Sequence, residues 1–283
     1  MPLRWTLEEQ NLLQEVRARL RHKLDDRPQF PEVVGDRKLI RFIRGHGHQL
    51  EKVCEMVENF LDWRTRNNVD HIRDQIVKNG INHWTKFPKG DLITRLIPSV
   101  IIAADALDKR GSPICIDQYN FSPSSVLEQI TLEDYMLYTI YGLEYRSLIL
   151  EQLSHEREEA LLRERVAARS AGRFVDDSEP YGVIVQTCVI RDLGGIGFDH
   201  MGSQGQAILK PVIAVASDNY PEMMRKCYMV NCPWIFNTVW FVIKGWLADK
   251  TVEKVTVFGS TYINDLQADI LLENIPKLLT GNV

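Results

Sequence analysis

The sequence lacks any uncharged apolar run that approaches the ~20 residues needed to cross a bilayer as a helix. The run that comes closest to this length covers residues 233–243, and the charged residue Lys244 follows it directly. The first residues also lack the apolar segment that defines a secretory signal peptide. These absences predict a cytoplasmic protein in which any contact with membranes is peripheral.

Paired cysteines and an excess of positive charge are also missing. The five cysteines are scattered, odd in number and never arranged as C-x-x-C, so they predict neither a disulfide framework nor a zinc site. The formal net charge of -4 argues against a nucleic-acid partner. We expect a reducing compartment, in which most cysteines serve as small buried apolar residues.

The common catalytic and nucleotide-binding motifs are absent too. The sequence contains neither a P-loop nor a G-x-S-x-G elbow. The glycines at residues 194–197 follow an expected strand, but they lie too late in the chain for a dinucleotide fingerprint. His46 and His48 have no further ligands at a zinc-like spacing. We therefore expect no catalytic residue, no metal and no cofactor.

Two regions with different patterns of apolar residues make up the chain. In residues 1–80 the apolar positions recur at helical spacing, and Thr6 and Glu9 form a capping box at the start of the first helix. In residues 81–283 β-prone runs alternate with helical stretches, which is typical of a largely parallel sheet with right-handed crossovers. We predict an N-terminal helical bundle at residues 1–80, and an α/β domain at residues 81–283.

The individual elements of the second region are predicted from its breaks and periodicity. Two β-prone runs around a turn at residues 108–111 indicate a hairpin. The expected strands are residues 99–104, 113–117, 182–190, 227–231 and 254–259. The expected helices are residues 132–169, 204–220, 233–247 and 264–272.

Residues 233–247 form the most informative segment, with three tryptophans and two phenylalanines. A helix that is apolar nearly all round is normally buried on every side. The alternative is a helix that faces an apolar cavity on one side and, at times, a membrane interface on the other, where Trp and Phe are favoured. The residues alone leave both interpretations open.

The order of several motifs resembles the CRAL-TRIO lipid-binding family, and within it the branch typified by the fungal phosphatidylinositol/phosphatidylcholine transfer protein. The longest matching segment starts at Tyr220-Pro221-Glu222 and continues to Gly259-Ser260. Shorter segments that resemble the family pattern are residues 41–44, 108–113, 191–195 and 273–281. The resemblance implies a helical bundle beside a hydrophobic pocket, which is floored by the sheet and covered by a mobile gate helix at residues 233–247.

The resemblance also implies three groups of site residues. The candidate headgroup contacts are Arg44, His46, Glu222, Thr251 and Lys254. The candidate walls of the lipid pocket are Cys115, Thr187, Val189, Tyr228 and Val230. The candidate contacts of the gate helix with the membrane are Trp234, Phe236, Trp240, Phe241, Ile243 and Trp246.

The chain departs from the family pattern at positions that determine which lipid is bound. His46 and Gly47 stand where phosphoinositide-binding members carry a basic pair, and Met223 stands where they carry a basic residue. Val189 lacks a hydroxyl and Cys115 replaces a tyrosine of the phosphatidylcholine pocket, which weakens recognition of choline by aromatic rings. The cargo stays open between a phospholipid and another hydrophobic molecule, such as a sterol.

We predict a soluble, monomeric lipid carrier that exchanges one phospholipid or other hydrophobic molecule with membranes, or presents it to lipid-modifying enzymes. Moving a sixteen-carbon chain from a bilayer into water costs roughly 12 kcal/mol, at ~0.8 kcal/mol for each CH₂, so a carrier must offer an apolar wall. The alternative is a regulator of the same fold that docks a protein partner through helix 144–170 without transferring lipid. An oxidoreductase is a third hypothesis, which the absent motifs disfavour.

Overall fold

The computed structural model describes residues 3–275 and Leu279, and the chain divides into two units. Unit 1 comprises residues 1–69, 147–185 and 221–223, and unit 2 comprises residues 70–146, 186–220 and 224–283. Each unit is therefore built from segments that are separated in the sequence. The predicted boundary at residue 80 stays a prediction.

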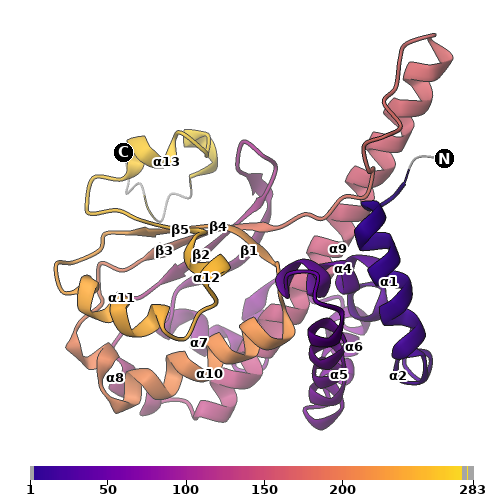
Figure 1. Ribbon diagram of the computed structural model, residues 1–283. Coiled ribbons are helices and arrows are strands. Elements are labelled where there is room, and N and C mark those ends of the chain that lie inside the picture. Colours follow the sequence, from indigo (N-terminus) through magenta and orange to yellow (C-terminus); the bar gives the residue numbers. More distant parts are fainter. Residues whose placement is uncertain (1–2, 276–278, 280–283) are drawn as a thin grey trace. The chain divides into compact units, whose positions relative to one another are not determined.

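Unit 1 is helical and contains its own hydrophobic core. Thr6 caps the first helix, because its hydroxyl accepts the amide of Glu9 at 3.2 Å while the Glu9 carboxylate accepts the amide of Thr6 at 3.2 Å. The apolar faces of α1, α4 and α5 pack together around fully buried Phe42 and Phe60 (Figure 1). The helices that begin in this unit are α1 (Leu7–Arg19), α2 (Arg21–Asp25), α3 (Pro31–Val34), α4 (Asp36–Gly45), α5 (Leu50–Arg66) and α6 (Val69–Lys78).

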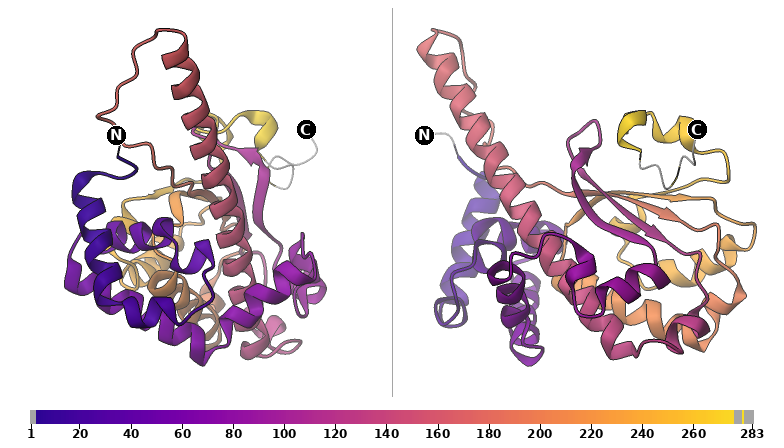
Figure 2. Two further views of the ribbon diagram at one scale, coloured as in Figure 1. Left: turned by 90° about the vertical axis from the view of Figure 1, so that its right-hand side faces the viewer. Right: turned by 180° about the vertical axis from the view of Figure 1, so that it is seen from behind.

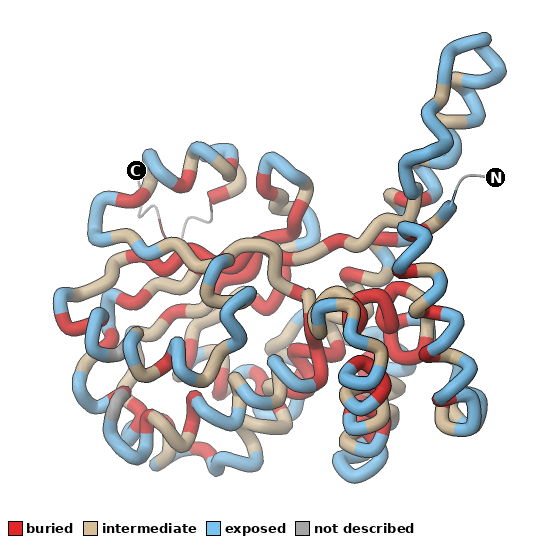
Figure 3. The backbone as a smooth tube through the Cα atoms, in the orientation of Figure 1, coloured by how far each residue is buried: buried red, intermediate tan, exposed pale blue. Residues whose placement is uncertain are grey.

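Helix α9 (Leu132–Ser170) is much longer than any other helix in the described part of the chain, and it contributes to both units. After its last turn the chain reverses and runs back along the helix (Figure 2). Arg169 forms an ion pair with Asp177, and Arg165 donates to the carbonyl of Glu179 at 3.3 Å, so side chains of the helix hold the returning segment. Figure 3 shows that this end of α9 is largely exposed.

Unit 2 contains a five-stranded sheet with the strand order β1-β2-β3-β4-β5. The first two strands are antiparallel, and all later neighbours are parallel, so the predicted α/β fold with a mostly parallel sheet is confirmed. The strands are β1 (Ser99–Leu107), β2 (Pro113–Gln118), β3 (Thr187–Asp192), β4 (Met224–Val230) and β5 (Val255–Val257). The remaining elements are η1 (Trp84–Lys86), α7 (Gly90–Leu96), α8 (Pro123–Leu127), η2 (Phe198–Met201), α10 (Ser203–Asn219), α11 (Phe236–Lys244), α12 (Asp249–Val252), α13 (Ile263–Leu266) and η3 (Leu272–Asn274).

The strand order decides which face of the sheet each helix covers. Strands β2 to β5 follow one another across the sheet, so crossovers of one hand place all connecting helices on the same face. Figure 1 shows α8, α10 and α11 on that face and α13 on the other. The α13 face is closed by apolar side chains that include Tyr262, Leu266 and Ile270, packed against Ile116 and Ile190 of the strands.

The apolar run that begins at Gly182 predicted a strand that starts five residues earlier than the observed β3. Strand β3 starts at Thr187, because the backbone before it makes its hydrogen bonds within unit 1. The amide of Gly182 donates to the carbonyl of Arg4 at 2.7 Å, and the amide of Val185 donates to the hydroxyl of Ser154 at 2.9 Å. Hydrogen bonds to distant segments thus replace the ladder that the local pattern suggests.

Short helices are the other difference between expectation and structure. The periodicity does not reveal α2, α3, α6 or α7, and the helix expected at residues 264–272 is limited to the single turn of α13. The helix expected at residues 233–247 is regular only in α11. None of the described helices combines the length and apolar character that a membrane span requires.

Candidate functional site

Unit 2 contains a cavity of about 140 Å³ between the sheet and helices α9 and α10. Strands β1, β2 and β3 supply one side, and the two helices supply the other. Every residue that lines the cavity belongs to unit 2. The cavity therefore lies on the face of the sheet opposite to the one that α13 covers.

One face of α9 forms the helical side of the cavity. Its lining residues follow the i, i+3, i+4 spacing of a single helix face. Gly142 permits the close approach of this helix to β1, because a Cβ atom there would lie 3.3 Å from the Cδ1 atom of Ile101. The residues of α9 that line the cavity are Tyr135, Tyr138, Thr139, Gly142, Leu143 and Arg146.

Charged side chains project into the cavity from the sheet and from α9. Asp117 of β2 and Arg191 of β3 are paired in register, and Nε of Arg191 donates to Oδ2 of Asp117 at 3.2 Å. Both side chains are about one-third exposed, at 29% for Arg191 and 30% for Asp117. Arg146 of α9 donates from Nε to the carbonyl of Ile101 at 3.0 Å. The cavity is thus lined by two guanidinium groups and one carboxylate.

Three tyrosines add hydroxyl groups to the lining. Burial raises the pKa of Tyr119 to about 12, and burial also raises the pKa of Tyr135 above its usual range. The hydroxyl of Tyr138 lies 3.4 Å from Oγ1 of Thr94. At neutral pH these phenols are protonated, so they are available as hydrogen-bond donors.

The predicted wall residues of the lipid pocket divide between the two faces of the sheet. Tyr228 and Val230 belong to the core on the α13 side. Cys115, Thr187 and Val189 alternate with residues of that core, so they lie on the opposite face. Three of the five predicted wall residues therefore lie on the cavity face of the sheet, and the other two lie on the opposite face.

Cys115 is chemically inert in this position. It is fully buried, and burial raises the pKa of its thiol to about 11. A thiol with such a pKa remains protonated at neutral pH, where it behaves as a small apolar group and not as a nucleophile.

The predicted headgroup residues in unit 1 make structural contacts. Arg44 donates from Nε to Oε1 of Glu9 at 2.6 Å, and the ring of His46 stacks on Phe42 with centroids 6.1 Å apart. The carbonyl of Glu222 accepts from Nη1 of Arg41 at 2.5 Å. Burial lowers the pKa of Arg41 to about 10, so this buried guanidinium remains charged at neutral pH while it holds the turn at Glu222.

The two other predicted headgroup residues, Thr251 and Lys254, belong to unit 2. Both are half-buried, and they lie in and just after α12. The amide of Lys254 donates to the carbonyl of Thr251 at 3.2 Å, and the amide of Cys227 in β4 donates to the carbonyl of Lys254 at 2.9 Å. These bonds fix both residues beside the middle of β4, and their role in binding a headgroup stays a prediction.

The segment predicted as a gate helix has one buried face and one exposed face. Phe236 and Ile243 are buried at 2% and 9%, whereas Trp234 and Phe241 are exposed at 84% and 71%. Trp240 is half-buried and stacks on Phe236 with ring centroids 6.0 Å apart. Trp246 is also half-buried, and Nζ of Lys210 lies 6.0 Å from the centroid of its ring.

The polar lining of the cavity is absent from the sequence-based predictions. A signal for it exists, because Asp117 lies two residues after Cys115 and Arg191 lies two residues after Val189. Residues two apart on a strand share a face of the sheet. Asp117 and Arg191 are therefore expected on the same face as the predicted wall residues Cys115 and Val189. Arg146 gives no such signal, because its position opposite the sheet depends on how α9 packs.

The described residues do not form a metal site. Within residues 3–275 and Leu279, no three side chains of His, Cys, Asp or Glu are grouped so that they hold a metal ion.

Comparison with known proteins identifies a family and a set of relatives. The family model described as CRAL/TRIO domain matches residues 99–281. The Sec14 cytosolic factor of Schizosaccharomyces pombe is 28% identical over 253 residues, which cover 89% of this chain and 77% of that protein. The SEC14 cytosolic factor of Kluyveromyces lactis is 29% identical over 254 residues, covering 89% of this chain and 72% of that protein.

A plant relative and a solved structure extend the comparison. The phosphatidylinositol/phosphatidylcholine transfer protein SFH9 of Arabidopsis thaliana is 26% identical over 246 residues, covering 86% of this chain and 36% of that protein. The crystal structure of Sfh5 superimposes with a TM-score of 0.59 at 15% identity, covering 89% of this chain and 80% of the other. The structural likeness supports the assignment of the fold.

Proposed function

Because this chain belongs to the CRAL/TRIO domain family, we propose that it is a carrier that encloses one lipid and exchanges it with membranes. The relatives include proteins named as phosphatidylinositol/phosphatidylcholine transfer proteins, which favours a carrier over a regulator that only docks a protein partner. The cargo of the proposed carrier is a phospholipid or another hydrophobic molecule. Its action as a monomer, without a catalytic step and without a cofactor other than the lipid, is part of the same proposal.

The observation that carries the proposal is the division of α11 and its flanks into a buried and an exposed aromatic face. Phe236 is buried, while Trp234 and Phe241 present their rings to solvent. Aromatic rings are favoured at the bilayer interface, where they enter the boundary between headgroups and acyl chains. Nζ of Lys244 lies 5.2 Å from the ring of Phe241, which places a positive charge where anionic lipid headgroups would meet the helix.

The experiment measures transfer of fluorescent phosphatidylcholine, phosphatidylinositol and a sterol between vesicles of phosphatidylcholine and phosphatidylserine. The test variant is the double substitution Trp234→Ala/Phe241→Ala. Insertion of each ring contributes about 1.5–3 kcal/mol, so losing both lowers vesicle binding by about 100-fold or more. We expect transfer of the transported lipid to fall in parallel.

A matched control is Phe174→Ala, which removes a ring that is 91% exposed in the segment after α9. We expect this variant to bind vesicles and to transfer lipid like the unmodified protein. Equal transfer by the double variant and the control would show that α11 is not the membrane contact. If the unmodified protein transfers none of the three lipids, the proposal that it is a lipid carrier is overturned.

A further inference from the structure

The cavity of unit 2 has an unbalanced set of charges. Of the residues that line it, Arg146, Arg191 and Asp117 are the only ones with an Arg, Lys, His, Asp or Glu side chain. Arginine remains protonated in proteins. Even with Asp117 fully ionised, the lining therefore carries one more positive charge than negative charges.

The lining also contains hydrogen-bond donors that have no acceptor among the described residues. Nε of Arg146 and Nε of Arg191 each reach a protein oxygen, but their terminal nitrogens donate to no acceptor in the described part of the protein. The hydroxyls of Tyr119 and Tyr135 likewise have no hydrogen-bond partner among the described residues. A partly buried guanidinium is stabilised when an anion completes its hydrogen bonds.

On these grounds we propose that the cavity binds the anionic group of an amphiphilic cargo, either a phosphate or a carboxylate, through Arg146 and Arg191. This inference rests on the proposed carrier function and adds the chemical class of the cargo to it. Guanidinium groups match the oxygen geometry of phosphate and carboxylate, and the tyrosine hydroxyls supply further donors. A cationic head such as an isolated quaternary ammonium meets like charge here, and a sterol hydroxyl leaves the excess charge uncompensated.

The size of the cavity agrees with a headgroup and not with a whole lipid. A cavity of about 150 Å³ holds a molecule the size of benzene. The volume here, about 140 Å³, accommodates a phosphate or carboxylate with a few neighbouring atoms, but not an acyl chain. The polar end of the cargo thus occupies the sheet side of unit 2, and its apolar part extends beyond this cavity.

The test compares four single-chain amphiphiles that share a dodecyl tail and differ only in the head. Dodecyl phosphate, tridecanoate and dodecyltrimethylammonium below their critical micelle concentrations, and dodecanol below its solubility limit, are titrated into the full-length protein, and affinities are measured by calorimetry. We expect at least one of the two anionic amphiphiles to bind about 10- to 100-fold more tightly than dodecanol, which is the effect of one or two charge-assisted hydrogen bonds. Equal affinity for all four heads would overturn the anion site while leaving the carrier intact.

Substitutions of the two arginines test whether the preference for an anionic head arises in the cavity. Arg146→Gln and Arg191→Gln are each expected to remove most of the preference for the anionic head, while dodecanol binding persists and shows that the variant is folded. Arg95→Gln, at an exposed arginine of α7 outside the cavity lining, serves as the matched control and should retain the full preference. A preference that survives both cavity substitutions would overturn the assignment.

Two further measurements distinguish the anionic head of a lipid from a soluble anion, and the anion site from the carrier function on which it rests. If inorganic phosphate alone binds as tightly as dodecyl phosphate, the site serves a soluble anion, and the lipid part of the inference is overturned. If no amphiphile binds and no lipid is transferred between vesicles, the carrier itself is wrong. Tight binding of an anionic amphiphile with weak binding of inorganic phosphate supports both the anion site and the carrier function.

Discussion

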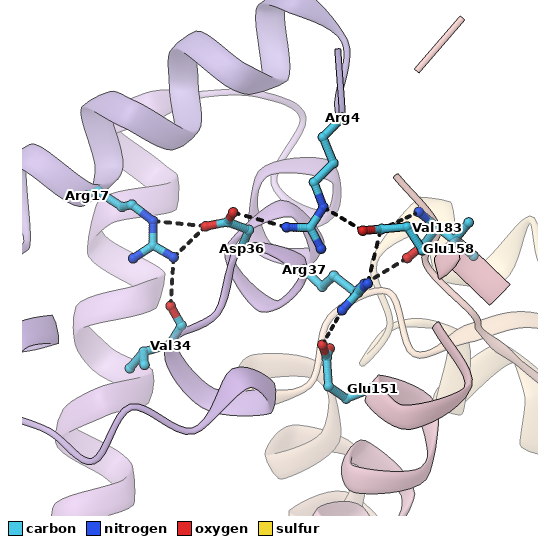
Figure 4. A network of polar contacts seen from close by, with 8 residues as sticks. All are labelled: Arg4, Arg17, Val34, Asp36, Arg37, Glu151, Glu158 and Val183. Carbon is cyan, nitrogen blue, oxygen red and sulfur yellow. Dashed lines mark hydrogen bonds and ion pairs between the residues drawn. The ribbon is translucent and has the colours of Figure 1, made fainter. Parts of the chain in front are cut away.

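Arginine clusters lie in both units, and they differ in their balance of charge. The cluster in unit 1 joins three guanidiniums to three carboxylates (Figure 4). The lining of the cavity in unit 2 contains two guanidiniums and one carboxylate, of which Arg191 and Asp117 form an ion pair. The balanced cluster needs no further ion, so its role is to hold segments of the chain together. The unbalanced cluster is completed only by an anion from outside, which is the mark of a binding site.

Arg37 is the central residue of the balanced cluster. Its side chain is buried, and its three nitrogens meet Oε1 of Glu151 at 2.5 Å, Oε2 of Glu158 at 3.0 Å and the carbonyl of Val183 at 3.1 Å. Nε and Nη1 donate hydrogen bonds, whereas the contact of Nη2 with Glu158 is an ion pair without hydrogen-bond geometry. These contacts connect α4 to the second half of α9 and to the segment before β3, all within unit 1.

The largest effect is expected from Arg37→Met. The substitution removes a buried guanidinium that contacts the half-buried carboxylate of Glu151 and the buried carboxylate of Glu158, and Glu158 keeps its ion pair with Arg4. We expect a loss of about 3–5 kcal/mol in the free energy of unfolding. Urea denaturation followed by circular dichroism measures the loss. Any variant that remains folded should keep its preference among dodecyl amphiphiles, because Arg37 does not line the cavity.

Arg17→Met is the matched control in the same cluster. Its side chain is 39% exposed, and it pairs with Asp36, which is 33% exposed. Solvent screens such a pair, so the expected loss is no more than about 1 kcal/mol. Equal losses for Arg17→Met and Arg37→Met would refute the view that burial of the central arginine sets the stability of the cluster.

An intermediate effect is expected from Asp117→Asn, which increases the imbalance in the cavity. The ion pair with Arg191 is partly exposed, so the loss in the free energy of unfolding is at most about 1 kcal/mol. Removal of the carboxylate frees the guanidinium of Arg191 for the ligand and removes a negative charge from the lining, so affinity for the anionic amphiphile should rise about 10-fold. A fall in that affinity would instead mean that Asp117 positions Arg191, contrary to the argument from charge balance.

The sequence predicts the features that depend on neighbouring residues, but not the contacts between residues that are far apart in the chain. The capping box at Thr6 and the hairpin of β1 and β2 depend on neighbouring residues, and both are confirmed. Alternation along β3 places Arg191 on the same face as Val189, but the pairing of Arg191 with Asp117 requires the strand register. No local pattern brings Arg37 to Glu158, because the two are far apart in the chain and meet only through tertiary packing.

Arg44 illustrates how a residue that the family pattern assigns to the headgroup also takes part in folding. Its guanidinium contacts the buried carboxylate of Glu9 at 2.6 Å and 3.3 Å. Burial alone would raise the pKa of Glu9, but the hydrogen bond and the charge of Arg44, together with the hydrogen bonds from Thr6, outweigh it and lower the pKa below its ordinary 4.5. A carboxylate with a lowered pKa stabilises the folded state above its unfolded-state pKa, and that contribution is lost as the pH falls through the folded-state value.

The smallest effect is therefore expected from Arg44→Gln, and its size depends on pH. The variant should be less stable than the unmodified protein by no more than about 1 kcal/mol at neutral pH, because Arg44 is 40% exposed. The difference should shrink as the pH falls from the higher pKa of Glu9 in the variant to its lowered pKa in the unmodified protein, and it should vanish once Glu9 is protonated in both folded proteins. Urea denaturation between pH 7 and pH 3 measures this convergence, and NMR titration should show the pKa of Glu9 rising in the variant. A difference in stability that stays constant with pH would show that Arg44 contributes through packing on Trp5, whose ring centroid lies 5.8 Å away, and not through the charge of Glu9.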